Sequence, residues 1–71
     1  MATDKRWMGE VPETCDVCDV PLSKFTWWVE GRTVHGPWDN MCPDCFEELG
    51  TGLGIGYGQK YDTNTLKKLE G

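Results

Sequence analysis

The 71-residue sequence has little of what catalysis, membrane binding or phosphate binding requires. His35 is the one histidine, and no serine or second histidine stands ready to form a catalytic set with it. Lysine and arginine number 7 against 12 acidic residues, and the net charge of −5 repels phosphate backbones. No stretch suits a membrane span or a lipid-surface anchor. Residues 1–10 contain charges and no apolar segment, so we expect no signal peptide and a cytoplasmic location.

The sequence does contain four cysteines, arranged as the two pairs Cys15-Asp16-Val17-Cys18 and Cys42-Pro43-Asp44-Cys45. Two pairs with this spacing allow four sulfurs to converge tetrahedrally on one Zn²⁺. In each pair the tight turn can direct backbone N–H groups at a thiolate. We therefore predict one structural zinc ion bound by Cys15, Cys18, Cys42 and Cys45. Because protein ligands fill every coordination position, water or substrate has no place on the metal, and we predict a protein that is not an enzyme.

Three other uses of the cysteines remain open. Two disulfides would suit a small secreted domain, which the expected cytoplasmic location disfavours. A dithiol redox centre would need a strand-helix-strand pattern that is absent here. A rubredoxin-like iron site has the same four ligands and differs mainly in the electronics of the ion. Whether the ion is zinc or iron, it substitutes for the large hydrophobic core that so short a chain cannot build.

The segment between the cysteine pairs predicts a β-hairpin. Residues 24–30 alternate and are rich in aromatic and β-branched residues, which is typical of a strand. Glu30-Gly31 predicts the turn and residues 32–35 the returning strand. The face expected to be buried carries Phe25, Trp27, Val29 and the cross-strand Val34. Trp28 is expected to point to the opposite side.

A short helix is predicted from the second cysteine pair onwards. Pro43 suits its first position and Gly50 its end, with the inward side chains Cys45, Phe46 and Leu49. We call the turn that contains each cysteine pair a knuckle. A knuckle followed by a hairpin and then a second knuckle at the start of a helix predicts a small metal-stabilised α+β domain, a treble-clef-like zinc finger. A zinc ribbon is the alternative. The expected organisation is a lead-in at 1–14, the zinc domain with its glycine-rich extension at 15–61, and a tail or short helix at 62–71.

Glycine alternates with other residues from Gly50 to Gly58. An extended segment would present one bare backbone face and one face carrying Leu53, Ile55 and Tyr57. A flexible loop is the alternative. The run matches neither of the common glycine-rich nucleotide-binding motifs.

The CDVC at 15–18, together with GRTVHGPWDNMCPDCFEELGTGLGIGYGQKY at 31–61, resembles small four-cysteine proteins commonly encoded by tailed bacteriophages and prophages. The resemblance rests on the cysteine pairs, the Gly36-Pro37-Trp38 turn and the alternating glycines. It implies a phage origin and a life in the host cytoplasm, but no activity, and the only functional residues that it carries over are the four cysteines.

Two functions fit these features. The first is an acidic module that binds a protein, in this setting a host protein, with Trp7, Trp28 and Tyr57 as candidate contacts. The second is a nucleic-acid-binding zinc finger, in which Trp27 or Trp28 would stack on bases. Its phosphate contacts would be Lys24, Arg32 and Lys60. A small enzyme or redox protein is a weaker third class, because the predicted zinc site offers no reactive position.

Overall fold

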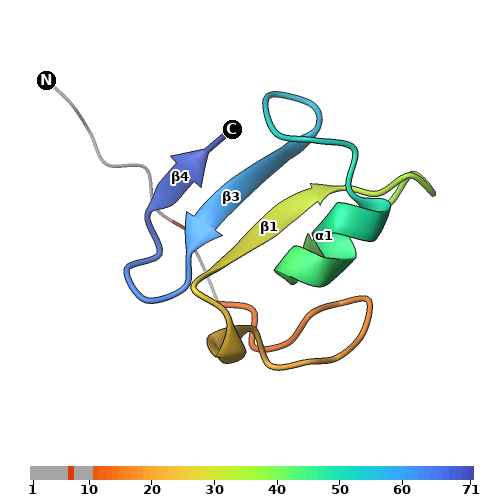
Figure 1. Cartoon of the computed structure of the whole chain (residues 1–71). Coiled ribbons are helices and arrows are strands. Elements are labelled where there is room, and N and C mark those ends of the chain that lie inside the picture. The colour runs from red at the N-terminus through yellow and green to blue at the C-terminus, as the bar shows by residue number, and fades with distance from the viewer. Residues whose placement is uncertain (1–6, 8–10) are drawn as a thin grey trace, which may run out of the picture.

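The computed structural model describes Trp7 and residues 11–71, and the rest of the expected lead-in, 1–6 and 8–10, lies outside the described residues. In the described part, four antiparallel strands form one sheet in the order β2-β1-β3-β4, and α1 packs against β1 and β2 (Figure 1). The elements are the 3-10 helix Leu22–Lys24, β1 Trp27–Arg32, β2 Trp38–Met41, α1 Pro43–Leu49, β3 Gly58–Asp62 and β4 Lys68–Glu70. The predicted α+β class is therefore confirmed, and no described helix is long and apolar enough to cross a membrane.

The hairpin that follows the first cysteine pair has a different turn from the predicted one. β1 continues through Gly31, and the partner of β1 is β2 rather than residues 32–35. The chain reverses at Gly36, which has a φ of 107° and donates its amide to the Thr33 carbonyl oxygen at 2.9 Å. A positive φ suits glycine, so Gly36 is the turn glycine of this hairpin. The prediction that the returning strand lies at residues 32–35 is wrong. The returning strand is β2, which follows the Gly36 turn and ends immediately before Cys42.

β1 is a central strand that is covered on both faces. Trp28 and Val29, which point to opposite sides, are both buried, and Trp28 is only 1% exposed. On its side of the sheet the Trp28 ring stacks on Tyr61 with the centroids 5.3 Å apart, and meets the edge of Trp7 at 5.7 Å. The opposite orientation predicted for Trp28 is confirmed. Its expected exposure is wrong, because the side chains of Tyr61 and Trp7 pack on the face that local alternation left open.

The glycine run is a turn and not an extended strand. Gly52, Gly54 and Gly56 all have positive φ, and the Gly54 amide donates to the Gly58 carbonyl oxygen at 2.8 Å. This turn returns the chain to β3, where Gly58 lies opposite Gly31 of β1. The expected bare backbone face therefore does not exist, and the absence of side chains serves the turn and the close β1–β3 contact instead.

Gly58→Ala is expected to destabilise the protein by about 1–3 kcal/mol, the usual cost of overpacking. A Cβ at this position would lie 2.8 Å from the Gly52 carbonyl oxygen and 3.2 Å from a Val29 methyl group. Chemical denaturation of the metal-loaded variant measures the effect, with Glu47→Ala on the exposed side of α1 as the control. Equal stability of the two variants would contradict the close approach.

The C-terminal segment forms part of the sheet, so the expected tail or short helix is wrong. The Asp62 side chain accepts hydrogen bonds from the amides of Asn64 and Thr65, both at 2.8 Å. These bonds hold the pKa of Asp62 below its usual value and close the turn that starts β4. Polar residues of this kind also cap helices, because capping and Asx turns use the same side-chain chemistry, and here they make a turn instead.

Candidate metal centre

Two segments far apart in the sequence bring the four cysteines together. Cys15 and Cys18 lie in the loop before the 3-10 helix, while Cys42 is the N-cap of α1 and Cys45 lies in its first turn. Their four Sγ atoms all lie within 4.8 Å of one another, and all four cysteines are free thiols. The predicted convergence of the two pairs is confirmed, and the cluster is positioned to bind a single metal ion.

The spacing of the sulfurs fits a tetrahedral ion. Zinc–sulfur bonds of about 2.3 Å place the sulfurs of a tetrahedral site about 3.8 Å apart. The Sγ atoms of Cys18 and Cys42 are 3.8 Å apart. A disulfide would require sulfurs about 2 Å apart, so this arrangement favours metal binding over oxidation.

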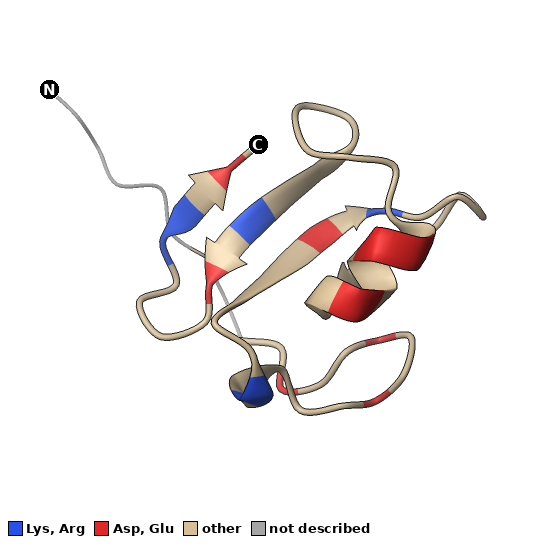
Figure 2. Cartoon of the chain, viewed as in Figure 1, with Lys and Arg blue, Asp and Glu red and all other residues tan. Residues whose placement is uncertain are grey.

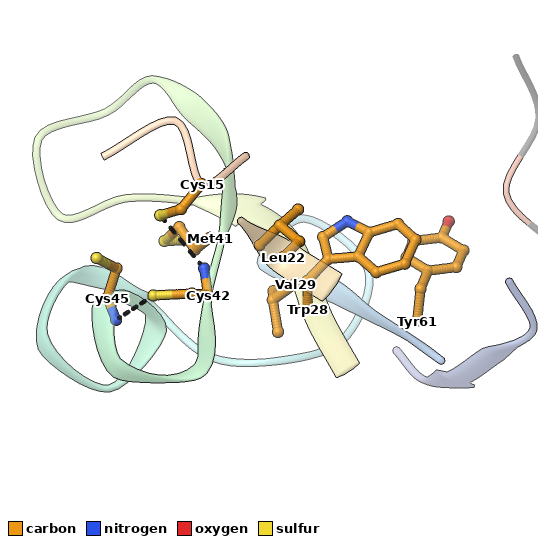
Figure 3. Packing of buried hydrophobic residues seen from close by; sticks show 8 residues of the cluster. All are labelled: Cys15, Leu22, Trp28, Val29, Met41, Cys42, Cys45 and Tyr61. Carbon is orange, nitrogen blue, oxygen red and sulfur yellow. Dashed lines mark hydrogen bonds between the residues drawn. The ribbon is translucent and has the colours of Figure 1, made fainter. Parts of the chain in front are cut away.

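Backbone amides point at the sulfurs, as Figure 3 shows for two of these contacts. Cys15 Sγ accepts from the amides of Val17 and Cys42, each at 3.4 Å, and Cys42 Sγ accepts from the amide of Cys45 at 3.5 Å. Burial by itself raises the pKa of Cys15, but amide hydrogen bonds from Cys42, Cys18 and Val17 lower it to about 7. The folded chain therefore prepares at least one thiolate, the form that binds metal.

Burial raises the pKa values of the other two buried thiols, Cys42 and Cys45. These thiols resist ionisation because a buried charge without a counter-ion is costly. A bound cation supplies the missing positive charge, and its binding releases the thiol protons. The donor set therefore suits a divalent metal ion chemically as well as in its geometry.

Contacts outside the cysteines also join the two knuckles. The Asp16 amide donates to the Asn40 carbonyl oxygen, and the Asn40 amide donates to Asp16 Oδ2, both at 2.8 Å. This pair of hydrogen bonds attaches the first knuckle to the edge strand β2 just before Cys42. The two cysteine pairs are consequently held in register by the backbone as well as by their sulfurs.

The metal cluster is continuous with the hydrophobic core. Cys15, Cys42 and Cys45 belong to the same buried cluster as Leu22, Trp28, Val29, Met41 and Tyr61, which are shown together in Figure 3. Four protein ligands would fill the coordination positions of a tetrahedral ion, as they do in structural sites. Its physical effect would be to cross-link the knuckle loop to the start of α1.

The three candidate partner contacts differ in their surroundings. Trp7 is half-buried, and its ring makes T-shaped contacts with the rings of Trp28 and Tyr61. Trp28 is buried and cannot touch a partner in this fold, so its assignment as a surface contact is wrong. Tyr57 is 53% exposed. Ile55, which lies in the same glycine run as Tyr57, is 93% exposed.

The fold and the cluster define the class of the protein as a small α+β domain with four cysteines clustered as a possible metal site. No family model matches the chain, and neither a curated protein nor a solved structure matches it.

Proposed function

We propose that the protein is a small structural-zinc domain that acts by binding another protein and has no catalytic activity of its own. A site of four thiolates with tetrahedral spacing supports zinc, since structural zinc sites in proteins are almost always four-coordinate and tetrahedral. The order of knuckle, hairpin and second cysteine pair at a helix start supports the treble-clef type. The phage-like sequence features support a phage origin, a site of action in the host cytoplasm and a host protein as the partner.

The observation that carries this proposal is a group of exposed apolar side chains at one end of the domain, here called the apolar end. Its members are Val34 (60% exposed), Trp38 (46%), Ile55 (93%) and Tyr57 (53%). The segments that carry them meet around the end of β1: Arg32 pairs with Trp38, and the Arg32 amide donates to the Tyr57 carbonyl oxygen at 2.7 Å. Exposed apolar side chains on segments that meet in this way support an interaction site at this end.

Arg32 lies between two members of the apolar end. Trp38 lies opposite Arg32 on β2, and Tyr57, which immediately precedes β3, accepts from the Arg32 amide through its carbonyl oxygen. Residues opposite one another on neighbouring strands share a face. Tryptophan, arginine and tyrosine are the residue types that most often dominate the binding energy of protein interfaces.

The charge beside this end indicates the kind of partner. The neighbouring helix α1 carries Asp44, Glu47 and Glu48, and none of its seven residues is basic (Figure 2). Acidic groups next to an apolar patch favour a partner whose own apolar patch has a basic rim, because complementary charge steers association. The net charge of −5 acts in the same direction.

The basic residues needed by the nucleic-acid alternative are dispersed. Lys60 lies over the Trp27 ring at 4.3 Å and pairs with Glu70 at 3.9 Å, so it is engaged within the domain. Lys24 belongs to the 3-10 helix, at the other end of β1 from Arg32. Of the two tryptophans expected to stack on bases, Trp28 is buried. These positions favour a protein partner over a phosphate backbone.

The double substitution Ile55→Ser with Tyr57→Ser is expected to weaken partner binding more than tenfold, because removing central apolar contacts costs about 2 kcal/mol or more. The experiment is an affinity capture from host lysate with the metal-loaded protein, with the captured protein then purified and titrated. Leu69→Ser, an exposed apolar residue on β4, is the matched control.

A partner lost with the double variant and retained with the control supports the proposed surface. Equal capture by all three proteins would contradict it. A parallel titration with single- and double-stranded nucleic acid separates the two functions, since tight binding that weakens steeply with salt would favour the zinc-finger alternative.

A further inference from the structure

Cys18 differs from the other three cysteines of the cluster in its exposure. Cys15, Cys42 and Cys45 are buried, whereas Cys18 is exposed to solvent. It lies in the turn at 16–19, where every residue is exposed and which belongs to no helix or strand. A reagent in solution therefore reaches Cys18 before it reaches the other thiols.

The Cys18 sulfur also lacks the amide contacts that two of its neighbours have. Two backbone amides donate to Cys15 Sγ, and one donates to Cys42 Sγ. Among the described residues no backbone amide donates to the sulfur of Cys18 or of Cys45. An amide hydrogen bond stabilises the charge of a thiolate and makes it a weaker nucleophile. Because Cys45 is buried, Cys18 alone combines an exposed position with a sulfur free of such bonds.

A second thiol lies within reach of Cys18. The Sγ atoms of Cys18 and Cys42 are 3.8 Å apart, and a disulfide requires about 2 Å. The exposed turn at 16–19 can move by the difference, while Cys42 is held as the N-cap of α1. A bond between these two sulfurs would join the same two knuckles that a shared metal ion joins.

We propose that Cys18 is an oxidation site, at which a peroxide converts the metal centre into a disulfide between Cys18 and Cys42. The Cys18 thiolate attacks one peroxide oxygen, the O–O bond breaks, hydroxide leaves, and Cys18 becomes a sulfenic acid. The Cys42 thiolate then attacks the Cys18 sulfur, and a second hydroxide leaves as the S–S bond forms. Two electrons pass from the two thiolates to the peroxide.

This reaction releases the metal and keeps the two knuckles attached. Cys15 and Cys45 are the cluster thiols that remain, and two ligands do not hold an ion that requires four. The disulfide still ties the first knuckle to the start of α1. The inference rests on the metal centre of the proposed function and is independent of the partner surface.

The test adds hydrogen peroxide to the metal-loaded protein in the presence of a chromogenic chelator. We expect one ion to be released for each peroxide consumed. Trypsin cleaves after Lys24 and Arg32, so the two knuckles fall in separate peptides, 7–24 and 33–60. With free thiols blocked before digestion, mass spectrometry is expected to find these peptides joined, with fragmentation assigning the bond to Cys18 and Cys42. A disulfide within the peptide 7–24, or an ion that stays bound in excess peroxide, would overturn the proposal.

Alkylation with less than one equivalent of N-ethylmaleimide tests the order of reactivity by itself. Cys18 of the metal-loaded protein is expected to be labelled about tenfold faster than any other cysteine, and the three buried cysteines are matched controls within the same molecule. A first label on a buried cysteine, or an even distribution, would overturn the proposal. Native mass spectrometry beforehand separates the two ways to fail. A protein without an ion contradicts the metal centre and this inference together, whereas a loaded protein labelled elsewhere contradicts this inference alone.

Discussion

Removal of the bound metal is expected to unfold the protein from Cys15 through Leu49. Three of the eight residues in the buried cluster are cysteines, so the metal ligands themselves form much of the core. Structural zinc sites bind with an apparent free energy of about 10–16 kcal/mol, whereas a whole domain is stable by about 5–15 kcal/mol. A chain of this length has no comparable apolar interior to replace that contribution.

Circular dichroism before and after treatment with a strong chelator measures the effect, and native mass spectrometry counts the ions. One ion per chain and loss of the folded spectrum on chelation are expected. Cys45→Ser removes a buried ligand and is expected to behave like the metal-free protein, while His35→Ala, an exposed residue outside the cluster, keeps the ion and the fold. A folded spectrum that survives complete metal removal would contradict the prediction.

The same samples identify the metal. A zinc-loaded protein is colourless, because the closed d shell of Zn²⁺ allows no ligand-field transitions. A four-thiolate iron site is coloured and changes on reduction. The absorption spectrum of the purified protein therefore separates the proposed zinc centre from the rubredoxin-like alternative without any substitution.

The metal centre could be predicted from the sequence because its determinants are local. A two-residue gap between cysteines fixes each knuckle, and Pro43 with Gly50 marks the two ends of α1 by rules that need no knowledge of the fold. Only the convergence of the two pairs is a long-range event, and the chemistry of a shared metal makes that convergence predictable.

The errors all concern contacts between distant segments or turns with two possible readings. β3 pairs with β1, and β4 pairs with β3, and nothing in residues 24–30 indicates a partner so far along the chain. Alternating glycines have the same period as a strand, but the positive φ at Gly52, Gly54 and Gly56 makes them a turn. Gly31 and Gly36 are both suitable turn residues when judged locally. Because Gly31 pairs with β2 and β3 inside the sheet, the hairpin turn forms at Gly36 instead.

Trp28→Ala is expected to destabilise the metal-loaded protein by about 3–5 kcal/mol, as truncation of a fully buried aromatic residue does. Trp28 has the largest fully buried side chain among the described residues, and its ring contacts both Tyr61 and Trp7. The cavity left by alanine lies beside Tyr61 of β3 and Trp7, and the small remaining core cannot close it. Chemical denaturation monitored by circular dichroism measures the loss.

Tyr57→Ala is the matched aromatic control, because Tyr57 is 53% exposed and such substitutions change stability by about 0.5 kcal/mol or less. Both variants keep all four cysteines, so each is expected to retain one metal ion. A metal-loaded Trp28→Ala protein with a much lower unfolding midpoint would show that the sheet contributes stability beyond the metal cross-link. Equal midpoints for the two variants would contradict the buried position of Trp28 and return it to the surface as a candidate partner contact.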